Sequence, residues 1–170
     1  MYLMPTVSPS SIGEEIEQTK PFKSQRQEAL VAILRTADMV KRFLANSLCE
    51  FDITPQQFNV LRILRGAGPR GIPTLLIADR MIEQTPGITR LLDRLEERGL
   101  AERRRCTEDR RRVYCVITEE GRRLLGELDP TTESADEAAM AGLADEEIGG
   151  FVMSLSRIRA GLRGELAGGK

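Results

Sequence analysis

Six arginines lie within ten consecutive positions of this chain, from residue 103 to residue 112. A guanidinium group stays charged at neutral pH, and its planar fork of donors fits phosphate oxygens. The chain as a whole has 25 basic and 26 acidic side chains, so its overall balance does not predict a nucleic-acid partner. The distribution does, because residues 80–125 hold twelve basic and nine acidic side chains, whereas residues 126–170 hold four and nine. Gathered basic charge of this kind is what a local polyanion site requires.

The segment before these arginines has the pattern of two short helices joined by a tight turn, a helix-turn-helix, over residues 74–99. Thr85 is predicted to cap the second helix, with Pro86 at its first position. Gly99 is placed to end that helix in the left-handed conformation. The apolar residues expected to face inward from the two helices are Leu75, Ala78, Met81, Ile88, Leu91, Leu92 and Leu95.

The outer face of the second helix then presents Thr89, Arg90 and Arg94, a geometry suited to a DNA major groove. The alternative is a plain helical hairpin. In that case Arg90 and Arg94 are solvated and pair with Asp93 and Glu97 on their own helix.

A β-hairpin is predicted directly after this helix, with strands over residues 100–105 and 113–118. Thr118 is then expected to cap a further helix. A hairpin that follows a recognition helix is a wing, whose arginines can pair with phosphates or enter a narrow minor groove. The arginines that this wing would display are Arg103, Arg104, Arg105, Arg110, Arg111 and Arg112.

Residues 88–125 resemble the core signature of the MarR family of winged-helix transcription regulators. The family's wing pattern, Asp-x-Arg followed by alternating apolar residues and a Thr, falls on Asp109, Arg111 and the residues up to Thr118. The resemblance implies that Asp109 braces the wing by pairing with Arg111, which reaches into the minor groove. Thr89 and Arg90 match the Thr-Arg pair of the family's recognition helix.

The resemblance further implies a sequence-specific DNA-binding regulator, a repressor, that acts as a homodimer on palindromic double-stranded DNA. A small aromatic or phenolic acid is the effector that the family implies. Two features depart from the family pattern. Pro86-Gly87 replaces small hydroxyl residues, and Pro130 is expected to kink or split the helix after the wing. The candidate DNA-binding residues are Thr85, Thr89, Arg90, Arg94, Arg103, Arg104, Arg105, Asp109, Arg110, Arg111 and Arg112.

Helical regions flank the winged segment. Residues 24–49 read as a long amphipathic helix, and Thr54, Pro55 and Gln57 form a capping box for a helix that runs to about Leu64. Asp145 is expected to cap a last helix. The apolar stripe of that helix comprises Ile148, Phe151, Val152, Leu155, Ile158, Leu162 and Leu166.

The predicted fold is mainly α, a winged helix-turn-helix with a small β-hairpin and a helical dimerisation region. A flexible N-terminal arm covers residues 1–22, and a first dimerisation helix covers residues 24–50. The winged domain covers residues 54–118, and C-terminal dimerisation helices cover residues 119–168. Alternatively, the stripe of the last helix packs within its own monomer.

Cysteines leave a second regulatory hypothesis open. Cys106 and Cys115 lie on opposite arms of the wing near arginines, which would lower a thiol pKa and favour the reactive thiolate. A disulfide between them could therefore act as a redox sensor, whereas a reducing cytosol favours inert thiols instead. The three cysteines lack metal-ligand spacing and the chain has no histidine, so neither a metal site nor a cofactor is expected.

Other function classes have less support. Without histidine, Ser-His and Cys-His catalysis are excluded, and the clustered acids sit where helix capping explains them, so no catalytic residue and no enzyme is expected. A helical interaction module that does not bind DNA gives no reason for arginines on both the recognition helix and the wing. No apolar run is long enough for a membrane span, so a soluble, cytoplasmic protein is predicted.

Overall fold

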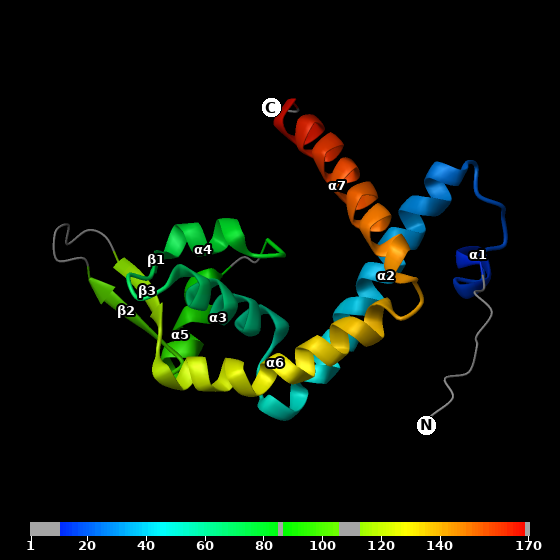
Figure 1. The fold of residues 1–170 in the computed structure, drawn as a ribbon. Helices are drawn as coiled ribbons and strands as arrows, with labels where there is room; N and C mark the ends of the chain where they lie inside the picture. Colours follow the sequence, from blue (N-terminus) through cyan, green and yellow to red (C-terminus); the bar gives the residue numbers. More distant parts are fainter. Residues whose placement is uncertain (1–10, 85–86, 106–112, 169–170) are drawn as a thin grey trace, which may run out of the picture.

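A winged helical unit lies at one end of the molecule, and long helices extend from it (Figure 1). The computed structural model describes residues 11–84, 87–105 and 113–168. The elements in chain order are α1 (Ile12–Glu15), α2 (Gln25–Leu48), a 3-10 turn η1 (Cys49–Phe51), α3 (Pro55–Ala67), β1 (Ile72–Pro73), α4 (Thr74–Arg80), α5 (Ile88–Glu97), β2 (Ala101–Arg105), β3 (Val113–Ile117), α6 (Glu119–Met140) and α7 (Asp145–Gly168). The predicted class, mainly α with a small β region in a winged helix, is confirmed.

The wing belongs to a three-stranded antiparallel sheet in the order β1-β3-β2. The predicted hairpin is present, with Ala101 opposite Ile117 and Arg105 opposite Val113. The strand β1 was not predicted, because its two residues lie in a segment rich in Gly and Pro. Ile72 and Pro73 pair with Cys115 and Tyr114 at the edge of the sheet, where proline is tolerated.

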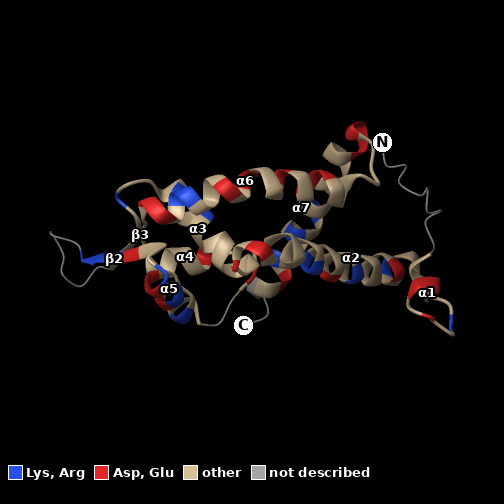
Figure 2. Ribbon diagram, turned by 90° about the horizontal axis from the view of Figure 1, so that it is seen from below, with Lys and Arg blue, Asp and Glu red and all other residues tan. Residues whose placement is uncertain are grey.

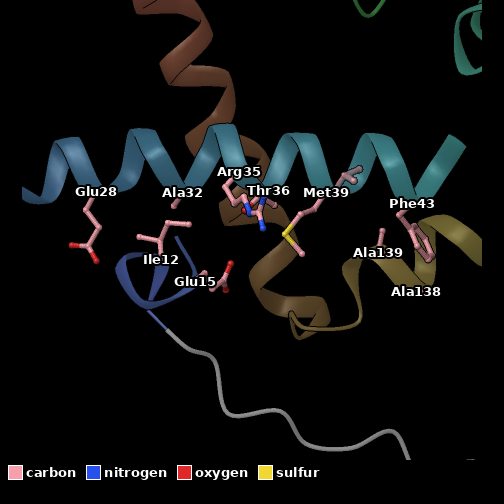
Figure 3. A pocket seen from close by; sticks show the side chains of 11 residues that line it. Ile12, Glu15, Glu28, Ala32, Arg35, Thr36, Met39, Phe43, Ala138 and Ala139 are labelled. Atoms are coloured by element: carbon pink, nitrogen blue, oxygen red, sulfur yellow. The ribbon is translucent and has the colours of Figure 1, made fainter. Parts of the chain in front are cut away.

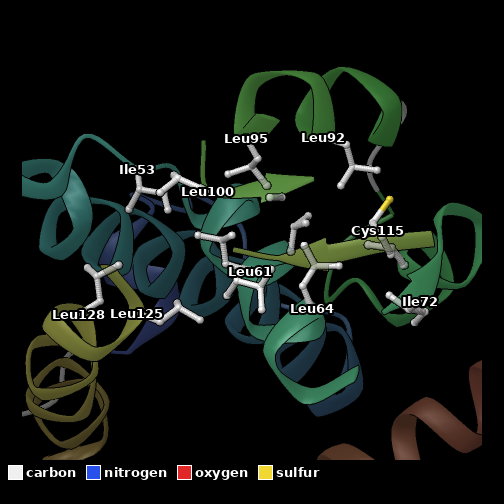
Figure 4. Packing of buried hydrophobic residues seen from close by; sticks show 14 of the residues in the cluster. Ile53, Leu61, Leu64, Ile72, Leu92, Leu95, Leu100, Cys115, Leu125 and Leu128 are labelled. Atoms are coloured by element: carbon white, nitrogen blue, oxygen red, sulfur yellow. The ribbon is translucent and has the colours of Figure 1, made fainter. Parts of the chain in front are cut away.

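One apolar core joins the helices of the winged unit to the sheet and to α6 (Figure 4). Leu61 and Leu64 of α3 meet Leu92 and Leu95 of α5, and all four side chains are at most 1% exposed. The inward positions predicted for α5 are confirmed, since Ile88 and Leu91 also pack on this core.

The prediction that Leu75 faces inward is wrong. Leu75 is 80% exposed, and α4 instead buries Ile77. The reason lies in the preceding strand. Helix α4 begins at Thr74, directly after β1, so the sheet fixes the rotation of the helix about its axis. With this rotation the side chain of Ile77 points toward the core.

Helix starts follow the caps that the sequence predicts. Thr54 and Gln57 form the capping box, with Gln57 N donating to Thr54 Oγ1 over 3.2 Å and Thr54 N donating to Gln57 Oε1 over 3.0 Å. Thr118 caps α6, and its Oγ1 accepts from Gly121 N at 3.0 Å. The last helix differs: Asp145 is its first helical residue rather than its cap, and Ala144 N donates to Glu147 Oε2 over 2.8 Å.

Helix α6 continues through Pro130, so the expected split is wrong. Proline removes one helical N–H, but two tertiary features hold the helix in place. Arg65 of α3 binds Asp129 through two hydrogen bonds of 2.8 and 3.1 Å, and α6 packs along α2. In addition, Thr132 Oγ1 donates to the carbonyl oxygens of Leu128 and Asp129.

Helices α2 and α7 carry apolar faces that their own chain leaves open. On α2, Leu30 and Leu34 are 58% and 64% exposed. Helix α7 projects from the end of α6, and Val152 and Leu162 on it are 53% and 56% exposed (Figure 1). Packing of the α7 stripe against the described remainder of its own monomer is therefore not observed. Among the described residues, no helix is long and apolar enough to cross a membrane.

The N-terminal arm expected over residues 1–22 includes a described helical turn. Ser11 and Glu14 form a capping box at the start of α1, which packs against α2.

The close approach of α6 to the start of β2 gives a stability prediction. A Cβ at Gly121 would lie 2.2 Å from the Leu100 carbonyl oxygen, so Gly121→Ala should lower the free energy of unfolding by about 1–3 kcal/mol. Gly126 is the matched control in the same helix, because a Cβ there meets nothing within 4 Å. Gly126→Ala should raise stability by about 0.5–1 kcal/mol. The midpoints of urea unfolding of the two variants, measured at equal protein concentration, test this prediction. Equal shifts of both midpoints in the same direction would contradict it.

Candidate nucleic-acid interface

The exposed face of α5 carries the polar residues predicted for a recognition helix. Thr89, Arg90 and Arg94 are all exposed, while Leu92 and Leu95 on the opposite face are buried. Because the buried leucines fix the rotation of the helix, its basic side chains have to point outward. Arginine positions, blue in the ribbon of Figure 2, occur along α5 and at the outer end of β2.

The start of α5 differs from the prediction. Thr85 and Pro86 lie outside the described residues. Gly87 occupies the N-cap position with a φ of 94°, and the helix begins at Ile88. The prediction that Thr85 caps the helix is therefore wrong, because the left-handed backbone at Gly87 separates Pro86 from the first helical residue. Glycine adopts this conformation without the steric cost that a Cβ brings.

The acidic residues of α5 do not neutralise its outward arginines. In the hairpin alternative Asp93 pairs with a basic residue of its own helix, but its Oδ1 lies 2.8 Å from Arg103 Nη1 of β2. Arg90 and Arg94 form no ion pair with any described carboxylate. The guanidinium groups of Arg90 and Arg94 are therefore not held by the acids of their own helix, although Glu97 there is exposed as well.

On the wing, neighbouring arginines of β2 have different surroundings. Arg104 and Arg105 are exposed, and Arg104 pairs with the half-buried Glu102. Arg103 is only 24% exposed at its side chain and turns toward α5. The remaining wing candidates, Asp109, Arg110, Arg111 and Arg112, lie outside the described residues.

Arg103 is bound from several directions by α5. Its Nη1 contacts Glu96 Oε2 as well as Asp93, its Nη2 donates to the Thr89 carbonyl oxygen over 3.2 Å, and its backbone N donates to Glu96 Oε1 over 2.7 Å. Partial burial disfavours the cation, but the hydrogen bond that Arg103 donates to Asp93 and the charge of Glu96 outweigh this effect and raise the pKa of Arg103. Arg103 is therefore a charged link between the wing and the recognition helix.

Comparisons with known proteins agree with this geometry. The MarR family model matches residues 53–113, which span the helix-turn-helix and part of the wing. A MarR transcription factor structure from Planctomyces limnophilus is 38% identical, with a TM-score of 0.62 over 80% of this chain and 98% of that one. The transcriptional regulator HosA of Escherichia coli O111:H- is 30% identical over 96 residues, 56% of this chain and 70% of HosA. The structure of CouR from Rhodococcus jostii RHA1, bound to p-coumaroyl-CoA, is 25% identical with a TM-score of 0.69, over 81% of this chain and 95% of CouR.

The chain belongs to the MarR family. It is therefore a DNA-binding transcriptional regulator with a winged helix, as the sequence predicts. MarR-family proteins are transcription regulators rather than enzymes.

Sequence reasoning placed Arg103 on the DNA-facing wing and missed its contacts with α5. The sequence does contain a signal for these contacts, because side chains along a strand alternate between its two sides. Ala101 is an apolar residue facing the core, so Arg103, two positions on, faces the same side while Arg104 faces the other. The acidic residues Asp93 and Glu96 then supply its partners on the helix packed over that side.

The wing cysteine of this MarR chain is poorly suited to redox sensing. Cys115 is fully buried, and its Sγ lies 3.4 Å from Thr74 Oγ1. Burial raises the pKa of its thiol, and this outweighs the lowering by Thr74 and by the Arg103 charge. The expectation that nearby arginines favour a thiolate at Cys115 is therefore wrong. Its proposed partner Cys106 lies outside the described residues.

Thiol reactivity tests this assignment. In a Cys106→Ser variant, one thiol, the exposed Cys49, should react quickly with Ellman's reagent at pH 8. Cys115 should react only after unfolding in guanidinium chloride, because a raised pKa lowers its thiolate fraction and burial blocks the reagent. Cys49→Ser in the same background should remove the fast phase. Two fast thiols in the folded Cys106→Ser protein would show that Cys115 is accessible.

Proposed function

We propose that this MarR-family regulator represses transcription by binding a palindromic operator as a homodimer, with α5 in the major groove and the wing beside it. The observation that carries the proposal is that the two exposed arginines of α5 form no ion pair with any described carboxylate. Arg90 and Arg94 are exposed there while Asp93, the acid nearest to them in sequence, is held by Arg103. A guanidinium left free in this way can bind the paired acceptors of a guanine edge.

The proposal gives different tasks to the two groups of basic residues. Residues of the recognition helix, Thr89, Arg90 and Arg94, with Thr85 ahead of it, read base edges. Wing residues contact phosphates and the minor groove, which adds affinity for all sequences alike. The wing residues assigned to this task are Arg104, Arg105, Arg110, Arg111 and Arg112, and Asp109 supports them by pairing with Arg111.

Dimerisation is supported by the open apolar faces of α2 and α7. Helix α7 makes little contact with the described rest of its own chain, yet its apolar residues follow one face over its length. Leaving such a face in water is unfavourable, at roughly 25 cal/mol for each Å² of apolar surface. A second copy that offers the same two faces would cover them, and a two-fold pair would place its recognition helices on half-sites about 10 base pairs apart.

A cavity of about 750 Å³ belongs to this open region (Figure 3). It lies where α1, α2 and the end of α6 meet, with Met39, Phe43 and Ala139 among its lining residues. Its charged lining residues are Glu15, Glu28 and Arg35, which are two acidic side chains and one basic side chain. This balance does not favour an anionic ligand, and we assign the cavity to the dimer surface.

The proposal includes release of the protein from its operator by a small molecule, and a related protein supports this part. The structure of CouR is described as bound to p-coumaroyl-CoA, an aromatic acyl compound. A ligand that binds the DNA-incompetent arrangement of the dimer more tightly would shift the population away from the operator.

DNA binding and its specificity test the function directly. An operator duplex should be selected from random DNA with the full-length protein, and its Kd compared with that of a scrambled duplex. Arg90→Ala should narrow the difference in binding free energy between the two by about 1–3 kcal/mol, because a bidentate base contact is lost. The control is Arg26→Ala, an exposed arginine at the far end of α2, which should leave the difference unchanged. Absence of selective binding by the unmodified protein would refute the proposed function.

The dimer surface has its own test. Ile158 lies within the apolar stripe of α7, and Ala160 lies on the opposite side of the same helix. Ile158→Glu should shift the protein toward monomer, because each dimer would bury two unpaired carboxylates. Ala160→Glu adds the same charge outside the stripe and should remain dimeric. Analytical ultracentrifugation measures both, and a dimeric Ile158→Glu protein would place the interface elsewhere.

A further inference from the structure

Adjacent side chains of β2 point to opposite sides of the strand and lie in different surroundings. Arg104 is 59% exposed at its side chain and, within the described part of the chain, pairs only with Glu102, two positions earlier on the strand. Arg103 is 24% exposed and faces the inner side of the hairpin, opposite Cys115 in the register of β2 and β3. Of these two adjacent arginines, Arg104 therefore faces solvent and Arg103 faces α5.

The Arg103 contacts reach across much of the recognition helix. They include the backbone carbonyl of Thr89 and the side chains of Asp93 and Glu96. These positions are four and three residues apart, so they lie along one face of α5 over about two turns. A single planar group bound at three places along a helix fixes both the rotation of the helix and its position along the strand.

The same contacts withdraw Arg103 from DNA. One positive charge stands against two carboxylates, Asp93 and Glu96, so the group of three carries a formal charge of −1. A phosphate could bind this guanidinium only by displacing a carboxylate that already accepts its hydrogen bonds. Charged partners held this way are costly to separate where they are partly buried.

From these contacts, we propose that Arg103 is a positioning residue that sets α5 against the wing and thereby governs sequence discrimination, and not a phosphate contact. The inference rests on the proposed function, since it assumes that α5 reads bases. Base readout requires donors placed to within a fraction of an ångström, so a recognition helix free to shift against the wing loses selectivity before it loses general affinity.

Arginine is required for this task rather than any cation. Its five donors lie in one rigid plane and can bind several acceptors at once, whereas the ammonium of lysine is a compact point charge. Lysine is nonetheless an adequate phosphate ligand. Arg103→Lys therefore separates the two roles, because it keeps the charge and removes the multiple attachment.

The experiment measures the ratio of Kd values for the scrambled and selected duplexes. Arg103→Lys should reduce this ratio by about tenfold, comparable with the loss of one specific base contact. Arg26→Lys, the same substitution at an exposed arginine of α2 outside the interface, should change it by less than about threefold. Circular dichroism and thermal melting should show that both variants remain folded.

A second variant removes an acid. If the acids of α5 act on DNA only by charge, Glu96→Ala should tighten binding to every duplex, because a negative group near the phosphates is lost. The positioning role instead predicts a loss of selectivity. The ratio of the two Kd values should fall about tenfold in Glu96→Ala, as it does in Arg103→Lys. Glu97→Ala is the matched control, since Glu97 is exposed, adjacent and equally charged but outside the Arg103 contacts. It should not lower the ratio.

The outcomes are distinct. If the unmodified protein shows no preference for the selected duplex, the proposed function fails, and the inference with it. If that preference exists and Arg103→Lys retains it within about threefold while Glu96→Ala tightens binding to both duplexes, Arg103 is a phosphate contact and only the inference fails. Loss of selectivity in both variants, with both controls unaffected, supports the positioning role.

Discussion

The packing of α5 onto the core is the constraint on which the rest of this interface depends. Leu92 and Leu95 are buried against α3 and the sheet, so rotation of α5 would carry apolar side chains into water. Burial of one face therefore decides which side chains form the other, and places Arg90 outward. The hydrophobic effect is non-directional, so burial of these leucines decides which face of α5 points inward more firmly than it decides where the helix lies along its own axis. The polar contacts of Arg103 add the direction that the leucines lack.

The two parts of the molecule differ in how completely they bury their apolar surface. The winged unit closes on itself, since helices α3, α4 and α5, the sheet and the first half of α6 share one core. The long helices α2 and α7 do not close, and large apolar side chains stay exposed on both. A chain that buries one set of apolar faces and leaves another open is organised for association, because single exposed apolar residues are common but continuous stripes are not. The ion pair between Arg65 and Asp129 lies where the two parts join.

Local signals made much of the fold predictable from sequence. The capping residues Thr54 and Thr118 each have one geometric task, accepting the first free N–H groups of a helix, so their positions could be read directly. Long-range effects could not be read in this way. The strand β1 has only two residues and exists because β3 is beside it. Pro130 has an intrinsic preference to break helices, but packing against α2 and the pairing of Asp129 with Arg65 override it. The start of α5 was misplaced because a threonine followed by proline matches a cap pattern, whereas the backbone at Gly87 decides where the helix can begin.

The same limit applies to charge. A count of basic and acidic residues gives this chain a net charge of −1, which by itself does not predict a nucleic-acid partner. What a phosphate meets, however, is the set of charges that remain after the protein has paired its own. Along α5 the acids Asp93 and Glu96 are turned inward to Arg103, so the arginine with the most partners contributes least to the outward field, while Arg90 and Arg94 contribute fully. Internal pairing thus divides arginines of equal formal charge into those that hold the helix and those that face the ligand. Sequence composition cannot make that division, because it depends on which side of a strand each residue occupies.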